Sequence, residues 1–276
     1  MNISVWLDSA GGGRVLVADS LSYFEHQAHL DDVAVGASFA GAATAAMAMR
    51  GGVKAWIAHE GGPGKDDAGV SGLALAQRFG VPAAAIATMT AGLSRGMTLI
   101  SGTVSRANQA ALALGVRPGQ TGGEAARLML EAPRGRPCNL HGIIDESIHE
   151  VEIAANGRIF AVWSFARVKG AHPRDVFCVA SHAGKVMADY ARQVRPRGLI
   201  ANDAGRGLDD SGIDGLEAMG TTPAAAVSAA SARIGDALST YRDGVISAAN
   251  AAALAIGVRP GITAKEAARL MLQTGV

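Results

Sequence analysis

A long internal repeat constrains the fold of this chain more than any other feature of its sequence. The peptide GVRPG at residues 115–119 recurs 142 residues later at 257–261, and both copies lead into the pattern Thr-x-x-Glu-Ala-Ala-Arg-Leu-Met-Leu. Upstream, residues 64–69 are echoed by residues 207–212, 143 positions later. A repeat of this length predicts a duplicated unit of domain size rather than the turn of a solenoid. We therefore expect two similar units, at residues 1–132 and 149–276, joined by a Pro- and Arg-containing linker at 133–148.

Each repeat begins with a pattern typical of a β-hairpin. In the first repeat, residues 3–7 and 14–18 are apolar-rich runs on either side of a Gly-rich turn at 10–13. In the second, residues 151–154 and 158–165 flank the pair Asn156-Gly157. An Asn-Gly pair between two apolar runs favours a tight hairpin, because both residues tolerate positive φ.

After the hairpin, short apolar runs alternate with helical patterns. We expect strands at residues 33–37, 55–58 and 83–88, and at 176–180, 199–201 and 224–228. We expect helices at 41–50, 67–79 and 103–114, and at 184–194, 211–219 and 244–256. Thr121 with Glu124, and Thr263 with Glu266, have the spacing of a capping box and predict a last helix in each repeat. The expected class is therefore α/β, with two similar doubly wound α/β units, each preceded by a β-hairpin and related by a pseudo-twofold axis.

The composition of the chain argues against nucleic acid and membranes as binding partners. The net charge is +1 and 18% of residues are charged, which gives no electrostatic footprint for nucleic acid or for a membrane surface. There is no N-terminal leader pattern and no apolar run of spanning length, so we expect a cytoplasmic protein. The two cysteines, Cys138 and Cys178, do not indicate a disulfide framework. Arg far exceeds Lys, as in GC-rich bacterial genomes, and Ala-rich helix faces with 4% aromatic residues favour a homo-oligomer.

Three loops per repeat reach the carboxyl ends of the expected strands, where ligands bind in parallel α/β folds. The first loop reads SFAG at residues 38–41 and SHAG at 181–184. Ser38 and Ser181 stand near a helix start, so they predict either a substrate-binding anion site or plain helix N-caps. His182 is found in the second repeat alone and is a candidate catalytic residue, although a lone His is more often structural.

The second loop carries the strongest signal, HEGGPGKDDAG at residues 59–69 and NDAGRGLDDSG at 202–212. A carboxylate, Glu60 or Asp203, ends each strand, and such a group beside an apolar run is costly unless it is paired or functional. We predict Glu60 and Asp203 as general acid or base, with His59 as a further catalytic residue and Asn202 as a substrate-binding residue.

The second and third loops supply further candidates for substrate binding. Asp66 and Asp209 precede the next expected helix, so they either bind substrate or cap that helix. The third loop differs most between the repeats, at residues 90–98 and 231–244. Arg233 is predicted to hold a substrate carboxylate through two hydrogen bonds, and Asp236 to act as a base. The alternative for this loop is a solvated segment with an internal salt bridge.

No motif for a redox cofactor or nucleotide is present, and no residue is assigned as a metal ligand, although the carboxylates are compatible with a divalent metal. His29 and His172 align at 143 residues, which predicts a structural turn shared by both repeats.

These patterns favour an enzyme of small-molecule metabolism. We expect it to act on a small polar metabolite with a carboxylate or amide group, by carboxylate acid–base chemistry, with hydrolysis in a strand-end cleft between the repeats. The alternatives are a small-molecule-binding protein without chemistry, an assembly protein, and an isomerase or lyase. The last rests on a layout of two similar lobes, which is similar to that of racemase-type enzymes. The paired strand-end cysteines of aspartate/glutamate racemases are replaced here by His59-Glu60 and Asn202-Asp203, so that family is not indicated.

Overall fold

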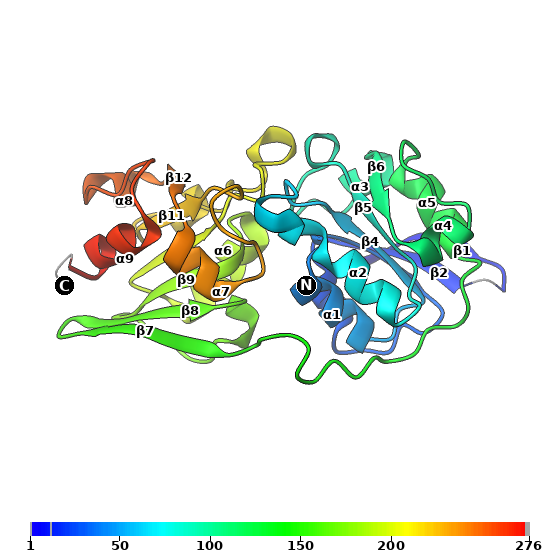
Figure 1. The fold of residues 1–276 in the computed structure, drawn as a ribbon, viewed down its shortest axis with the longest axis horizontal. Coiled ribbons are helices and arrows are strands. Elements are labelled where there is room, and N and C mark those ends of the chain that lie inside the picture. Colours follow the sequence, from blue (N-terminus) through cyan, green and yellow to red (C-terminus); the bar gives the residue numbers. More distant parts are fainter. Residues whose placement is uncertain (1, 12, 274–276) are drawn as a thin grey trace. The chain divides into compact units, whose positions relative to one another are not determined.

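The computed structural model describes residues 2–11 and 13–273, and the chain folds as two compact units (Figure 1). Unit 1 comprises the chain up to Gly62, Ala68–Ile144 and Gly207–Asp209. Unit 2 comprises Pro63–Asp67, Asp145–Arg206 and the chain from Asp210 onward. The main division, after Ile144, falls within the linker expected at 133–148. Residue 12 of the expected first turn lies outside the described residues.

Unit 1 contains a six-stranded mixed sheet in which strands adjacent in the chain are adjacent in the sheet. The first two strands form the predicted antiparallel hairpin, the next three continue in parallel, and the last returns antiparallel. All residues of β3 and β4 are buried, as expected for parallel strands that are covered on both faces. The strands are β1 (Ile3–Ser9), β2 (Gly13–Ala18), β3 (Val33–Phe39), β4 (Ala55–His59), β5 (Ala83–Ile86) and β6 (Val104–Ala107).

Separate apolar layers cover the two faces of this sheet. Trp56 of β4 belongs to the layer that contains residues of α1 (Ala42–Arg50), α2 (Ser71–Arg78) and the 3-10 helix η1 (Leu21–Phe24). Its neighbour Ile57 belongs to the opposite layer, with residues of α3 (Thr98–Ser101) and α5 (Gly122–Met129). The alternation follows from the two-residue period of a strand. The remaining helices of the first repeat are η2 (Lys65–Val70), η3 (Thr88–Thr90) and α4 (Gln109–Ala113).

Unit 2 repeats this plan with a second six-stranded sheet, whose strands again follow chain order. Its strands are β7 (Ile148–Ala154), β8 (Gly157–Val162), β9 (Val176–His182), β10 (Gly198–Asn202), β11 (Ala224–Val227) and β12 (Ile246–Ala249). The helices of the second repeat are η4 (Phe165–Arg167), α6 (Lys185–Val194), η5 (Leu208–Asp210), η6 (Glu217–Met219), α7 (Ala237–Asp243), α8 (Ala251–Ala255) and α9 (Ala264–Gln273). The prediction of a duplicated α/β architecture, with a hairpin at the start of each copy, is confirmed.

Two predicted helices, at 103–114 and 244–256, are wrong. Each stretch forms an antiparallel edge strand, β6 or β12, followed by the short helix α4 or α8. Asn108 and Asn250 cause the break, because each is the N-cap of the short helix and its side chain also accepts a hydrogen bond from the first residue of the neighbouring strand, Ala83 or Ala224. An N-cap residue has extended backbone, so the helix cannot continue backwards through it.

The helix predicted at 211–219 is also wrong, since this segment forms turns and only the short η6. The Asn108 side chain donates to the carbonyls of Leu73 and Val81, and that of Asn250 donates to the carbonyls of Leu216 and Thr222. Eight positions separate the first pair of carbonyls and six separate the second. The shorter segment lacks the length that α2 occupies in unit 1.

The predicted shared turn is held in both units by an ionic network around a buried carboxylate. Arg14 Nε and Nη2 each donate to an Asp32 carboxylate oxygen at 2.9 Å, and His29 Nδ1 donates to Asp32 at 3.2 Å. The equivalent network in unit 2 comprises Arg158, His172 and Asp175.

Both predicted capping boxes form. The Thr121 amide donates to Glu124 Oε2 at 2.7 Å and the Glu124 amide donates back to Thr121 Oγ1 at 3.2 Å, and Thr263 with Glu266 does the same. Among the described residues, both cysteines are free thiols. No helix in the described part of the chain has the length and apolar character needed to cross a membrane.

Candidate functional site

The predicted site residues all lie at the carboxyl ends of the parallel strands or in the loops that follow them. Ser38, near the end of β3, is buried, and its hydroxyl accepts a hydrogen bond from the Leu21 amide at 3.0 Å. Ser181, in β9, is partly exposed. The helices that follow begin at Gly41 and Gly184, without a side-chain cap. The interpretation of these two serines as helix caps is therefore wrong, and Ser38 instead ties β3 to η1.

His182 occupies the position that Phe39 has in unit 1, at the last residue of the strand. It is buried, and its Nδ1 accepts a hydrogen bond from the Gly184 amide at 3.1 Å. Each ring lies directly over a glycine, because a Cβ on Gly41 would be 2.3 Å from the Phe39 ring and one on Gly184 would be 2.8 Å from His182 Nδ1. This environment gives His182 a packing role that resembles that of Phe39.

His59 and Asn202 also occupy equivalent positions and make equivalent bonds. His59 is fully buried; its Nδ1 accepts from the Gly61 amide at 3.0 Å, and its Nε2 donates to the carbonyls of Thr88 and Ala91 at 3.0 and 3.2 Å. Asn202 Oδ1 accepts from the Ala204 amide at 2.8 Å, and its Nδ2 donates to a carbonyl of the loop after β11 at 3.2 Å. Burial lowers the pKa of His59, so the ring is neutral at pH 7. Both side chains connect two strand-end loops.

Glu60 is the carboxylate at the strand end of unit 1. Its Oε1 accepts hydrogen bonds from the amide and the hydroxyl of Thr88, both at 2.8 Å, and the same hydroxyl accepts from the Gly62 amide at 2.9 Å. The side chain is partly exposed, and among the described residues no donor contacts its Oε2. This leaves one carboxylate oxygen of Glu60 available to a ligand.

Asp203 is the equivalent carboxylate in unit 2 and has a different partner. It is 5% exposed, and its Oδ1 accepts from the amides of Gly205 and Ala229 at 3.0 and 2.9 Å. Its Oδ2 accepts from the Ser247 hydroxyl at 2.7 Å. Two backbone donors therefore fix the carboxylate, while its other oxygen accepts a hydrogen bond from a partly exposed serine.

Ser247 was not predicted from the sequence. It lies in β12 at a break in the register with β11, where Ile246 pairs with Val227 and Ala248 pairs with Ala226. The extra residue of such a β-bulge re-aims its side chain. Ser105 stands at the equivalent bulge of β6, where its hydroxyl donates to the Ala85 carbonyl at 3.2 Å. The signal that the sequence offered was Ser-x-Ala-Asn, kept at 105–108 and 247–250.

Left-handed backbone marks the loops after β4 and β10. Of the described residues other than glycine, eight have positive φ, and six of them lie in these loops: Asp66, Asp67, Ala204, Arg206, Asp209 and Asp210. Each such residue costs about 1–2 kcal/mol, and strain of this kind clusters at functional sites. Neither Asp66 nor Asp209 caps a helix, which corrects the capping alternative; Asp66 instead pairs with Arg233 at 3.5 Å and Asp209 with Arg95 at 3.3 Å.

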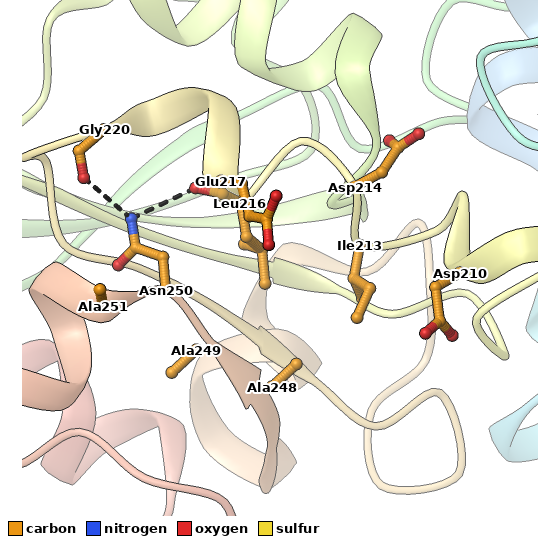
Figure 2. A pocket seen from close by; sticks show the side chains of 10 residues that line it. All are labelled: Asp210, Ile213, Asp214, Leu216, Glu217, Gly220, Ala248, Ala249, Asn250 and Ala251. Carbon is orange, nitrogen blue, oxygen red and sulfur yellow. Dashed lines mark hydrogen bonds between the residues drawn. The ribbon is translucent and has the colours of Figure 1, made fainter.

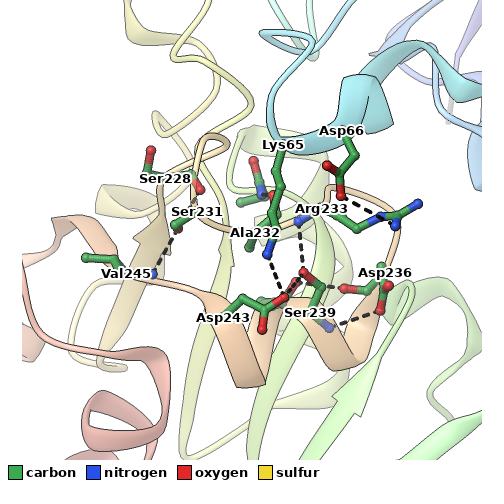
Figure 3. A network of polar contacts seen from close by, with 12 residues as sticks. Lys65, Asp66, Ser228, Ser231, Ala232, Arg233, Asp236, Ser239, Asp243 and Val245 are labelled. Atoms are coloured by element: carbon green, nitrogen blue, oxygen red, sulfur yellow. Dashed lines mark hydrogen bonds and ion pairs between the residues drawn. The ribbon is translucent and has the colours of Figure 1, made fainter.

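The loop after β11 forms a polar network within unit 2 (Figure 3). Asp243 Oδ2 accepts from Lys65 Nζ at 2.9 Å and from Ser239 Oγ at 2.8 Å. These hydrogen bonds, with that from Lys65 the larger influence, hold the pKa of Asp243 below its usual value. Asp236 caps α7 by accepting from the Ser239 amide at 2.9 Å. The predicted residues Asp66, Arg233 and Asp236 thus belong to one network, in which the loop's ion pairs run to Lys65 and Asp66 of the loop after β4 rather than within the loop itself.

The polar side chains at the strand ends therefore fall into two groups, those that make structural hydrogen bonds and the Asp203–Ser247 pair. Most predicted residues bind backbone groups or one another, whereas the Ser247 hydroxyl donates a hydrogen bond to the Asp203 carboxylate at 2.7 Å, with the Ala226 carbonyl as a longer second acceptor at 3.3 Å. Within the described residues, no group of three or more His, Cys, Asp or Glu side chains could hold a metal ion. Comparison of the chain with family models, with curated proteins and with solved structures finds no match.

Proposed function

We propose that the chain is a hydrolase of small polar metabolites that carry a carboxylate or amide group, with Ser247 as the nucleophile and Asp203 as its general base. The observation that carries the proposal is the 2.7 Å hydrogen bond from Ser247 Oγ to Asp203 Oδ2. A nucleophile within hydrogen-bond reach of a base, with the base oriented by further groups, is the arrangement that activates a serine. Here the orienting groups are the amides of Gly205 and Ala229.

The proposed reaction has two steps. Ser247 Oγ attacks the carbonyl carbon of an ester or amide bond while its proton moves to Asp203, and the leaving group departs with that proton. Water then attacks the acyl-serine, with Asp203 again accepting a proton and returning it to Ser247 Oγ as the ester bond breaks. General base catalysis of this kind contributes about 10²–10⁴-fold to a rate.

The first repeat supplies a built-in comparison for this assignment. Ser105 has the same place in a bulged edge strand, but its hydroxyl bonds to a backbone carbonyl, and Glu60 bonds to Thr88 instead. A serine without a carboxylate partner remains an ordinary alcohol. The proposal therefore assigns chemistry to the second repeat and none to Ser105.

A second candidate function is binding of a small molecule without chemistry. It is favoured by the saturation of Asp203 Oδ1 by two backbone amides and by the structural bonds of His59 and Asn202. In that case the Asp203–Ser247 bond would only join β12 to the loop after β10.

Labelling with a fluorophosphonate, followed by peptide mass spectrometry, distinguishes these functions because the reagent reacts with activated serines. We expect labelling of Ser247 and slow hydrolysis of p-nitrophenyl acetate. Asp203→Asn should reduce both about 10²-fold. The Asn oxygen can still accept from Gly205 and Ala229, and Ser247 can donate to the Ala226 carbonyl 3.3 Å away, so we expect the variant to fold.

Ser247→Ala should abolish both signals, and Ser105→Ala is the matched control that should leave them unchanged. The proposal is wrong if Ser247 is not labelled, or if Asp203→Asn, with the thermal stability of the wild type, is labelled at the wild-type rate. Equal labelling of Ser105 and Ser247 would also contradict it.

A further inference from the structure

We propose that unit 2 also binds a small organic ammonium ion, in a pocket separate from Asp203 and Ser247. The pocket has a volume of about 540 Å³ and lies between residues 210–220, β12 and the start of α8 (Figure 2). Its lining residues are Asp210, Ile213, Asp214, Leu216, Glu217, Gly220, Ala248, Ala249, Asn250 and Ala251. The volume falls within the range of about 300–1,000 Å³ that small-molecule sites have.

The pocket arises from differences between the two repeats. Ala248 pairs with Ala226 in β11, and the residue at the same register position in unit 1 is Arg106, which pairs with Ala85. A long side chain in β6 is thus replaced by a methyl group in β12.

The second difference is the covering segment. In unit 1 this face is covered by α2, whose Gln77 side chain accepts a hydrogen bond from the Ala110 amide of α4 at 3.0 Å. In unit 2 the equivalent segment, from Leu216 to Thr222, is two residues shorter than the segment from Leu73 to Val81 in unit 1. It turns at Gly220, whose φ of +58° favours glycine. Shortening of the helix and loss of the arginine open the same face of the sheet.

The pocket has an apolar floor and a negative rim. Ile213, Leu216 and the two alanines of β12 supply the apolar surface. Three carboxylates line the pocket and none of its lining residues is basic. Asp210 is paired with Arg206 at 2.8 Å, whereas no hydrogen bond or ion pair among the described residues engages the Glu217 carboxylate.

The amide of Asn250 does not add to the charge, because it is already bonded. Its Nδ2 donates to the carbonyls of Leu216 and Gly220 (Figure 2). Its Oδ1 accepts from the amides of Ala224 and Ala253. The ligand that fits an apolar floor with an unpaired carboxylate at its rim is a compact hydrocarbon body with one ammonium group.

A titration followed by ¹H–¹⁵N chemical shifts tests this proposal with three probes of similar shape: cyclohexylammonium, cyclohexanol and cyclohexanecarboxylate. We expect cyclohexylammonium to bind most tightly and cyclohexanecarboxylate least, with shifts at the amides of 213–220 and 248–251. Glu217→Gln should raise the dissociation constant for cyclohexylammonium about fivefold, as expected for loss of one charge contact in a solvent-exposed site.

Ala248→Arg restores the residue of unit 1 and should abolish binding through both bulk and charge. Asp189→Asn, on the exposed face of α6 outside the pocket, is the control that should change nothing. Equal affinity for the cation and the anion, or binding that survives Ala248→Arg, would overturn the proposal. Neither result bears on labelling of Ser247, so the proposed hydrolase activity is tested independently.

Discussion

Replacement of Asp32 by Asn should destabilise unit 1 by about 2–3 kcal/mol, although the two side chains have nearly the same shape. The Asp32 side chain is 5% exposed and accepts two hydrogen bonds from Arg14 and one from His29. Hydrogen bonds to charged groups contribute about 1.5–3 kcal/mol each, but the Arg14 side chain is 46% exposed and its charge is screened by solvent. The Asn amide also places an N–H against a donor of Arg14. Three such bonds would sum to about 4.5–9 kcal/mol. Because solvent screens Arg14 and the remaining Asn oxygen still accepts a hydrogen bond, we expect a loss well below that sum, about 2–3 kcal/mol.

The cost should depend on pH in a defined direction. Burial alone would raise the pKa of Asp32, but the hydrogen bonds from Arg14 and His29 outweigh it and hold the pKa below its usual value. Because an unfolded Asp titrates near pH 3.9, the carboxylate contributes its full stability above about pH 5 and loses it as the pH falls through the lower folded value. Asn does not titrate, so the difference between wild type and Asp32→Asn should shrink below about pH 4.

Urea unfolding in a Trp163→Phe background measures this effect in unit 1 alone, because the two tryptophans that remain, Trp6 and Trp56, both belong to unit 1. Asp31→Asn is the matched control, since Asp31 is exposed and its contact with Arg134 at 3.3 Å is a surface pair worth about 0–1 kcal/mol. The reasoning fails if Asp32→Asn costs no more than Asp31→Asn, or if its cost is the same at pH 3 as at pH 7.

Two further predictions concern buried groups. His59→Asn should change the free energy of unfolding by no more than about 1 kcal/mol, because Asn202 makes the equivalent bonds in unit 2. His59→Ala should cost about 2–3 kcal/mol, because it leaves the Gly61 amide and the Thr88 carbonyl unpaired. Equal costs of the two variants in urea titrations would refute this prediction. Burial raises the pKa of Cys178 to about 12, so the folded protein has almost no reactive thiolate at pH 8. Iodoacetamide at pH 8 should therefore modify Cys178 in urea but not in the folded protein. Rapid labelling of Cys178 without urea, seen by mass spectrometry, would contradict the structure.

The features of the fold that were predicted correctly depend on short stretches of sequence. Asn156-Gly157 encodes the hairpin turn, and Thr121 with Glu124 encodes the capping box, because all the interacting groups lie within a few residues. The helices at 103–114 and 244–256 were wrong for the opposite reason. Asn108 and Asn250 bond to the starts of strands that lie 25 and 26 positions earlier, and an Ala-rich stretch gives no sign of that partner.

The sequence likewise predicts only those parts of the candidate site whose signal lies within a short stretch of residues. Asp203 was identified because a carboxylate at the end of an apolar run is visible locally. Its partner Ser247 is 44 positions away, in a strand that was predicted as a helix. His59 was predicted as catalytic because nothing in the sequence shows that its two ring nitrogens bond to the backbone. The repeat itself offered the missing information, since Asn202 at the same position points to a role that an amide can also fill.

The order of strands in the two sheets has a consequence for how the chain folds. From β1 to β6, and again from β7 to β12, each strand pairs with the one that precedes it in the chain. Every pairing joins consecutive strands, so no step of sheet assembly has to close a loop longer than one crossover connection, and the entropic cost of closing a loop grows only slowly with its length. Each sheet can therefore grow one strand at a time in the order of synthesis, and the first copy can complete its sheet on the ribosome before the hairpin of the second has been translated.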